Sequence, residues 1–291
     1  MAKLVELDRD TFYIEGRVNI GVVKTGKGVI MIDTGIDDDS ARRALNILKS
    51  KGLEIIAVVN THSHADHIGG NHFIKRRTGV PIYAPQEEIP FIEHPVLEPV
   101  MLYGGWPPTY LTTKMYMAKP SKAQPLSELK IKDLEAIELP GHSPRMVGII
   151  HGEILFTADT FFPQSIIEKY KIPYSFDPQK ALSSLKKLEA TNYKLYVPSH
   201  GKPVSEITDV ITSNIIAIQR VRDEILALLE GEAYTTCRLV AEIFNKLGIN
   251  LRDPAMYILN TSALRGYLTW LQREGKIVQI IKDNIIKWTL K

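Results

Sequence analysis

Three histidines and one aspartate lie within six residues, in the segment THSHADH at positions 61–67. Imidazole and carboxylate groups are the ligands that zinc and neighbouring transition metals take in proteins, and crowding them is unfavourable unless a cation holds them together. Side chains alternate in an extended turn, so His62 and His64 can reach one ion while the adjacent Asp66 and His67 face another. The spacing therefore predicts a site for two metal ions.

These four side chains are too few for two catalytic ions, because each ion takes about three or four protein ligands and keeps one position open for water. His142 in LPGHSP, Asp159 in FTADT and His200 in VPSHG are the other candidates. They bring the ligating groups to seven, which suffice for two ions if one carboxylate bridges them around a shared hydroxide. We expect all seven to meet at one point.

Each candidate ligand follows an apolar run that is typical of a buried strand. The runs are EIIAVVN before the histidine cluster, LEAIELP before His142, EILFTA before Asp159 and YKLYVP before His200. Functional groups of α/β proteins lie in loops at strand ends, where the sheet holds them rigidly. The chain is therefore predicted to be an α/β protein whose strands end at these loops.

The segment 81–125 has a different composition. It holds nine of the 17 prolines, together with aromatic residues such as Tyr103, Trp106 and Tyr116. Proline removes an amide donor and interrupts regular hydrogen bonding, so we expect an irregular insertion here. Insertions of this length usually have a role, and two alternatives stay open: a lid over the substrate, or a packing and subunit-contact loop.

From about Ile215 onward the apolar residues recur with helical spacing. Three helices are predicted, the third opened by Asp253-Pro254, and a hairpin with its turn at Lys282-Asp283 follows. This order resembles a winged helix. For 291 residues we expect a main domain over 1–215 and a small winged-helix-like domain over 216–291.

The composition is that of an ordinary soluble globular protein, with 44% apolar and 24% charged residues. No apolar run approaches the roughly 18 residues that a membrane span needs, and the N-terminal segment is charged, so we expect a cytoplasmic protein without a membrane partner. The single cysteine, Cys237, excludes an internal disulfide framework and is expected to be buried on a helix. A net charge of +3 is too small to indicate nucleic-acid binding by itself.

The order His-x-His-x-Asp-His followed by a distant His, Asp and His resembles the metallo-β-lactamase superfamily over roughly residues 1–230. The resemblance implies an αββα sandwich. It also implies that His62, His64 and His142 bind one metal, that Asp66, His67 and His200 bind the other, and that Asp159 bridges them. Asp33 matches a carboxylate that supports the metal-binding loops without being a ligand.

Two divalent ions are therefore expected as cofactors, zinc first, with iron or manganese as alternatives. Two such ions lower the pKa of a bridging water, so a hydroxide forms near neutral pH and hydrolysis is the expected reaction. Asp66 is the candidate catalytic residue, because a ligand with a free oxygen can orient the hydroxide and accept its proton.

Several residues of this chain differ from those of known branches of the superfamily, and these differences narrow the range of expected substrates. True metallo-β-lactamases lack the bridging aspartate, which makes antibiotic hydrolysis unfavoured here, and His64 disfavours the flavodiiron branch, which has glutamate at that place. Acyl-homoserine lactonases carry a tyrosine where this chain has Phe162. The segment ADTFF is similar to a motif of glyoxalase II, the hydroxyacylglutathione hydrolase, so the resemblance favours a small-molecule thioester or ester.

Three alternatives stay open. A winged-helix-like tail resembles that of lactamase-beta-2 type proteins, some of which are endoribonucleases, but residues 220–291 carry 11 basic and 8 acidic residues, a weak surplus for phosphate binding. Nucleic acid is therefore not the favoured partner, and packing or homodimer contact is the expected role of the tail. A mononuclear iron persulfide dioxygenase is the second alternative, and a non-enzymatic DNA-binding protein is the third.

Overall fold

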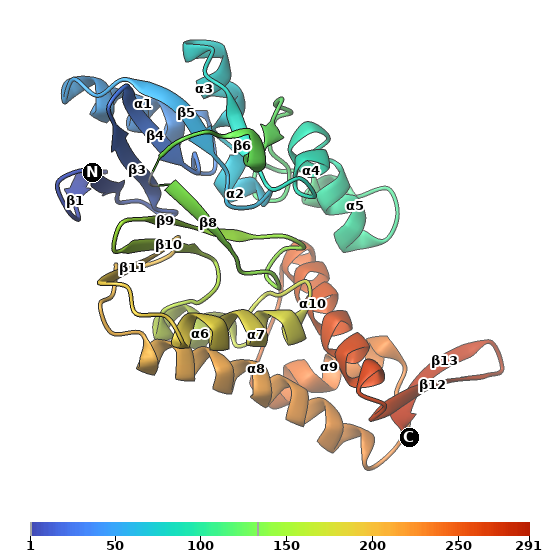
Figure 1. Cartoon of the computed structure of the whole chain (residues 1–291). Helices are drawn as coiled ribbons and strands as arrows, with labels where there is room; N and C mark the ends of the chain where they lie inside the picture. Colours follow the sequence, from blue (N-terminus) through green and yellow to red (C-terminus); the bar gives the residue numbers. More distant parts are fainter. Residues whose placement is uncertain (1, 133) are drawn as a thin grey trace.

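Two β-sheets pack face to face in the computed structural model, with helices on both outer faces (Figure 1). The structure describes residues 2–132 and 134–291. The layers follow the order helix, sheet, sheet, helix, and the expected αββα sandwich is confirmed.

The first sheet is built from the N-terminal part of the chain, and its strands lie in sequence order. They are β1 (Leu4–Glu6), β2 (Thr11–Ile14), β3 (Ile20–Thr25), β4 (Gly28–Ile32), β5 (Ile55–Val59), β6 (Ile82–Ala84) and β7 (Gln124–Pro125). Strands β1 to β4 pair antiparallel, and β4 to β7 pair parallel. The carboxyl ends of β4, β5 and β6 therefore lie at the same edge of the sheet.

The second sheet has the order β11-β10-β9-β8. Its strands are β8 (Leu134–Glu138), β9 (Val147–His151), β10 (Ile154–Ala158) and β11 (Leu195–Pro198). Strands β10 and β11 are parallel, and the other pairs are antiparallel. Because β8, β10 and β11 run in the same direction, their carboxyl ends also share one edge.

Apolar side chains fill the space between the sheets. Ile30 and Val59 of the first sheet belong to the same buried cluster as Val147, Ile149 and Phe156 of the second. Strands covered on both faces are expected to be continuous apolar runs, as β5 and β10 are. This core holds the two ligand-bearing edges against each other.

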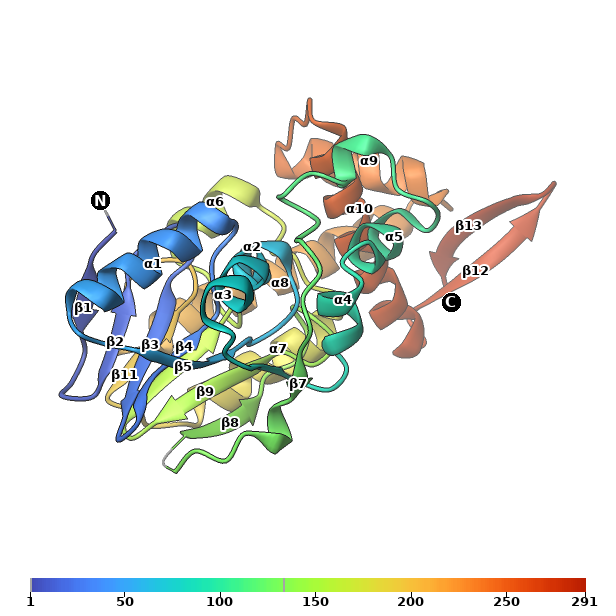
Figure 2. The ribbon, with the colours of Figure 1, turned by 90° about the horizontal axis from the view of Figure 1, so that it is seen from above.

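Helices cover the outer faces (Figures 1 and 2). On the first sheet lie α1 (Asp38–Ser50), α2 (Ala65–Ile68) and α3 (Asn71–Thr78), and on the second lie α6 (Gln164–Tyr170), α7 (Pro178–Glu189) and α8 (Thr208–Leu229). Helix α1 begins at the expected cap, where the Asp37 side chain accepts a hydrogen bond from the Ser40 amide. Its buried face, Ala41 and Leu48, packs in the outer core of the first sheet.

The segment 81–125 is more regular than its proline content predicts. It contains β6, α4 (Ile89–Glu93), α5 (Leu97–Tyr103) and the 3₁₀ helix η1 (Thr109–Leu111), and it ends in β7. A second 3₁₀ helix, η2 (Leu126–Glu128), follows directly after the segment. Pro90 lies in the first turn of α4, where a missing amide costs nothing. The expectation of an irregular excursion is therefore wrong at both ends, which join the first sheet.

The C-terminal region has the expected three helices and hairpin: α8, α9 (Thr236–Leu247), α10 (Pro254–Arg273), β12 (Ile277–Lys282) and β13 (Ile285–Leu290). The hairpin turn lies one residue later than expected, at Asp283-Asn284, because both residues adopt positive φ. Helix α8 runs across the expected domain boundary at residue 215. The division into 1–215 and 216–291, and the likeness of the second part to a winged helix, stay predictions.

The C-terminal hairpin projects from the body (Figure 2) and leaves Ile281 72% exposed.

Two further features bear on the sequence expectations. Cys237 lies on α9 and is exposed, so the expectation that it is buried is wrong. Among the described helices, none combines the length and apolar character that crossing a membrane requires.

Candidate metal centre

All seven predicted ligands converge where the carboxyl edges of the two sheets meet. They follow β5 (His62, His64, Asp66, His67), β8 (His142), β10 (Asp159) and β11 (His200). Their ligating atoms form three overlapping groups, and within each group they lie within 4.8 Å of one another: His62, His64 and His142; His62, His67 and Asp159; Asp66, His67 and His200. The structure thus brings the sequence candidates together.

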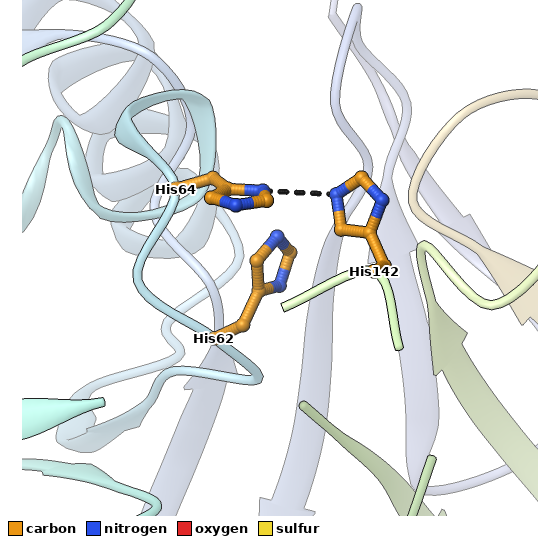
Figure 3. Close-up of side chains that lie close together, drawn as sticks. All are labelled: His62, His64 and His142. Carbon is orange, nitrogen blue, oxygen red and sulfur yellow. Dashed lines mark hydrogen bonds between the residues drawn. The ribbon is translucent and has the colours of Figure 1, made fainter. Parts of the chain in front are cut away.

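We call His62, His64 and His142 the first histidine set (Figure 3). His64 Nδ1 lies 2.9 Å from His142 Nε2, and the His62 ring is 4.6 Å from that of His64. His62 Nε2 is buried and has no hydrogen-bond partner. The three rings lie in the loops that follow β5 and β8, one strand of each sheet, and point toward a common centre.

The second ligand set is Asp66, His67 and His200. Asp66 Oδ2 lies 3.6 Å from His200 Nε2, and Asp66 Oδ1 lies 3.8 Å from His67 Nε2. Asp66 and His67 lie in the short helix α2, which begins directly after the extended residue His64. The change from extended turn to helix is what directs the two halves of the motif to different sides.

Asp159 lies between the two sets. Its Oδ2 is 3.3 Å from Nε2 of His142, 3.5 Å from Nε2 of His67 and 3.4 Å from Nε2 of His200. The preceding residue, Ala158, has φ of 50°, which turns the chain sharply at the end of β10. One carboxylate oxygen therefore faces nitrogens of both sets.

Four of the five histidine rings are held from behind through Nδ1. The acceptors are Thr61 Oγ1 for His62 (3.0 Å), Asp33 Oδ2 for His67 (2.9 Å), the Tyr174 carbonyl for His142 (3.1 Å) and the Arg17 carbonyl for His200 (2.9 Å). Fixing Nδ1 in this way directs Nε2 into the cluster, which is the usual arrangement of metal-binding histidines.

Asp33 joins two of these supports. Its Oδ1 accepts from the Thr61 amide at 2.8 Å, and its Oδ2 accepts from the Thr61 hydroxyl at 2.8 Å and from His67 Nδ1. Since the Thr61 hydroxyl donates to Asp33, it accepts from His62 Nδ1. Asp33 lies in none of the ligand groups, as the resemblance implies.

Burial and charge set the protonation of the rings. Burial, with the charges of neighbouring histidines added, lowers the pKa of His62 and His64 well below the usual value. Burial also lowers the pKa of His67, but the charges of Asp159, Asp66 and Asp33 outweigh it and raise the pKa well above 6.5. For Asp159, burial raises the pKa, while His200 and His67 lower it more strongly. The carboxylates thus attract positive charge to the centre of the cluster.

The cluster fits a metal cation. His62 Nε2, His67 Nε2 and Asp159 Oδ1 are all buried without a hydrogen-bond partner. Unpartnered buried polar atoms are costly and rare, so three at one point indicate a group that binds them. Nitrogen and carboxylate donors in this number are typical of zinc and related divalent metals.

Aromatic rings border the first histidine set. The Tyr174 ring is 5.6 Å from those of both His64 and His142, and the Phe162 ring is 5.8 Å from that of His142. A pocket beside His142 is lined by both aromatic residues and by apolar side chains such as Leu139 and Met146. The side of the cluster next to His142 is therefore largely apolar.

The remaining described histidines lie outside the cluster, as expected. His151 Nδ1 bonds to the Thr11 hydroxyl, and His72 bonds to the Pro120 carbonyl. Sequence reasoning missed Glu88, a buried carboxylate behind the cluster that contacts Ser63 and Ser143. Glu88 lies in the proline-rich segment, and no local motif marks it.

Comparison with known proteins places this geometry in a family. The model of the metallo-beta-lactamase superfamily matches residues 13–200, a range that includes every candidate ligand. The chain belongs to the metallo-β-lactamase superfamily. At this level the sequence-based expectation of a metal-binding hydrolase is confirmed.

Relatives in the superfamily are named as hydrolases. A probable metallo-hydrolase of Bacillus subtilis is 30% identical over 195 residues, which cover 64% of this chain and 82% of that protein. A hydroxyacylglutathione hydrolase of Methylobacillus flagellatus is 30% identical over 128 residues, covering 44% of this chain and 42% of that protein. The chain thus spans less than half of that second relative.

Solved structures of the superfamily share the fold. A metallo-beta-lactamase family protein of Thermus thermophilus superposes with a TM-score of 0.72 at 18% identity, covering all of this chain and 98% of that chain. A beta-lactamase domain protein of Burkholderia ambifaria gives the same score and identity, with 99% and 93% coverage.

Proposed function

We propose that this superfamily member is a two-metal hydrolase of small-molecule thioesters or esters. The observation that carries the two-metal assignment is the position of Asp159, whose Oδ2 lies 3.3 to 3.5 Å from histidine nitrogens of both ligand sets. A carboxylate between two groups of nitrogen donors is the arrangement that a bridging ligand requires.

In this proposal the first histidine set holds one ion and the second ligand set holds the other. Zinc is the proposed metal, with iron and manganese as alternatives, because imidazole and carboxylate donors suit all three. When bound, a pair of such ions supplies an activated water near neutral pH and polarises the oxygen of the scissile group.

Asp66 is the proposed proton acceptor. Its side chain is 28% exposed, whereas that of Asp159 is 5% exposed, so Asp66 is the carboxylate that incoming water and substrate can reach. Its oxygens lie 3.8 Å from His67 Nε2 and 3.6 Å from His200 Nε2, beyond hydrogen-bond distance, so one oxygen can bind an ion while the other orients a water and takes its proton.

Two observations support an ester or thioester substrate. The aromatic rings of Phe162 and Tyr174 beside the cluster suit an apolar acyl or thioalkyl group. In addition, several relatives are named hydroxyacylglutathione hydrolases, although each matches less than half of this chain.

A substrate panel tests the proposal. Purified protein loaded with zinc is assayed against acyl thioesters, carboxylic esters, lactones and a phosphodiester, before and after removal of metal with a chelator. We expect thioester or ester turnover that disappears with the metal and returns when zinc is added back. Turnover of the phosphodiester alone would assign another reaction to this site, as would oxygen consumption by an iron-loaded sample with a persulfide.

A further inference from the structure

Glu88 is a fully buried carboxylate outside the predicted ligand groups. It lies directly before α4, at the start of the segment 81–125, and is 0% exposed. Its two oxygens accept four hydrogen bonds. Such complete pairing indicates a specific role for a group whose burial is otherwise unfavourable.

The four hydrogen bonds are divided between two loops. Oε2 accepts from the Ser63 amide at 3.2 Å and from the Ser63 hydroxyl at 2.5 Å. Oε1 accepts from the Ser143 hydroxyl at 2.7 Å and from the Arg145 amide at 2.9 Å. Ser63 separates the first two members of the first histidine set, and Ser143 directly follows the third.

These loops belong to different sheets. The Ser63 loop follows β5 of the first sheet, and the Ser143 loop follows β8 of the second. Apolar packing between the sheets is not directional, so it fixes the spacing of the loops less closely than hydrogen bonds do. Apart from Glu88, a backbone bond from the Val147 amide to the Thr61 carbonyl also joins the two edges.

We propose that Glu88 is a positioning residue that sets the distance between the two loops and so makes the first histidine set converge on its ion. This inference deepens the proposed metal centre and rests on it. Glu88 belongs to none of the three ligand groups. It acts through the backbone of the two loops, and it acts on one ligand set only, because its hydrogen bonds reach neither Asp66 nor His200.

The chemistry of the four bonds defines a sharp variant. Each carboxylate oxygen accepts from one backbone amide, and a backbone amide can only donate. Glutamine has the same shape but a single acceptor oxygen. Glu88→Gln must therefore leave the amide of either Ser63 or Arg145 facing an NH₂ group, which releases one of the two loops.

Glu87 offers a matched control. It is the adjacent residue, and its carboxylate pairs with the Arg145 side chain at 3.0 Å on the surface. Glu87→Gln makes the same chemical change and touches the same arginine, but it leaves both loop amides bonded to Glu88. A second control, Leu247→Ala, removes a buried side chain of α9 and lowers stability without touching either loop.

The experiment is a titration of the metal-free, full-length protein with Co²⁺. Visible absorption and calorimetry measure the binding at each step of the titration. We expect two equivalents to bind to the wild-type protein and to Glu87→Gln. In Glu88→Gln one equivalent is expected to bind about tenfold to 100-fold more weakly, with a changed absorption band, while the other is unchanged.

Two results would overturn the role of Glu88: wild-type binding of both ions by Glu88→Gln, or the same one-site weakening in Leu247→Ala. If the wild-type protein itself bound fewer than two equivalents, the metal centre would be wrong instead, so the two failures are distinguishable.

Single serine variants keep the test decisive if Glu88→Gln does not fold. Ser63→Ala and Ser143→Ala each remove one hydroxyl donor while both backbone amides remain bonded to Glu88. Each is expected to weaken the same single equivalent of Co²⁺ by a few-fold. Unchanged binding in both folded variants would contradict the proposal.

Discussion

At the residue scale, the two carboxylates of the cluster differ in their access to solvent. Asp159 is almost fully buried between the two ligand sets, whereas Asp66 lies at the open side. The same chemical group can therefore have two roles: the buried Asp159 keeps a fixed negative charge between the ligand sets, and the accessible Asp66 can exchange a proton. The burial of Asp159 also explains why a single oxygen can face three histidine nitrogens.

Replacing Asp66 by asparagine tests this division. Asparagine keeps an oxygen that can face the second ligand set but cannot accept a proton, so we predict that kcat falls by about 10²-fold to 10⁴-fold. Metal content, measured by mass spectrometry on the same sample, is expected to stay within twofold of wild type. Asp38→Asn, which changes an aspartate paired with Lys119 at the surface, is the control and should keep full activity. Full activity in Asp66→Asn would refute the role.

The convergence of the candidate ligands was predictable because each of them follows an apolar run and four of them share one motif, but the groups behind them were not. The supports of His142 and His200 are backbone carbonyls, of Tyr174 and Arg17, which have no sequence signature. Glu88 becomes significant only when two distant loops meet. These contacts depend on tertiary approach, which the sequence of one chain does not reveal.

At the scale of elements, α1 and the segment 81–125 are joined by charge. Asp37, the N-cap of α1, also pairs with Lys114 at 2.8 Å. Burial raises the pKa of Asp37, but hydrogen bonds from Lys114 and Ser40 and the charge of Lys114 outweigh it and lower the pKa to about 2. The ionised carboxylate therefore stabilises the folded state.

Asp37→Asn isolates the charge, since asparagine caps a helix as well as aspartate does. The folded-state pKa is depressed, so the charge stabilises the fold above pH 4 to 5 and ceases to do so as the pH falls toward about 2. We predict that the free energy of unfolding falls by about 1 kcal/mol at pH 7, a value that allows for solvent screening of the exposed lysine, and by less at pH 3. Urea unfolding at both pH values measures it. Asp39→Asn is the exposed control, and a loss that grew at low pH would contradict the assignment.

The elements themselves were unevenly predictable. Long apolar runs located β5, β10 and β11, and Asp253-Pro254 marked the start of α10. Strand β9 was not predicted, because its short apolar run begins five residues after His142 and ends at no candidate ligand. Helix α7 was also missed, although Asp177-Pro178 is the same start signal as Asp253-Pro254.

At the scale of the whole molecule, one hydrophobic cluster joins the sandwich to the C-terminal helices. Leu185 of α7 and Ile211 of α8 belong to the same buried cluster as Leu239 of α9 and Leu268 of α10. Gly266 of α10 lies close to the start of α7: a Cβ there would be 2.9 Å from Pro178 Cδ and 3.0 Å from the Phe176 carbonyl oxygen. The two regions share a core.

Gly266→Ala is predicted to strain this contact. The added methyl must displace Pro178 or the Phe176 backbone, so we expect a loss of about 1 to 3 kcal/mol in the free energy of unfolding. Because the core is shared, unfolding should remain a single transition, with circular dichroism and tryptophan fluorescence changing together. Gly231→Ala, where a methyl would meet only the Leu228 carbonyl oxygen at 3.7 Å, is the control. Two separated transitions would show that the C-terminal region folds as an independent domain.

The family and its sandwich were predictable because the ligand motif is specific to them. The docking of the C-terminal helices was not, since their amphipathic pattern shows that a face is buried but not against what. The homodimer and the cytoplasmic location remain predictions.

The central claim is a centre of two metal ions that share Asp159, and metal analysis of the purified protein tests it most directly. We predict two equivalents of divalent metal per chain, zinc foremost, and fewer than two in Asp159→Ala at the same protein and metal concentrations. One equivalent of iron, or two equivalents that persist in Asp159→Ala, would contradict the shared two-metal site.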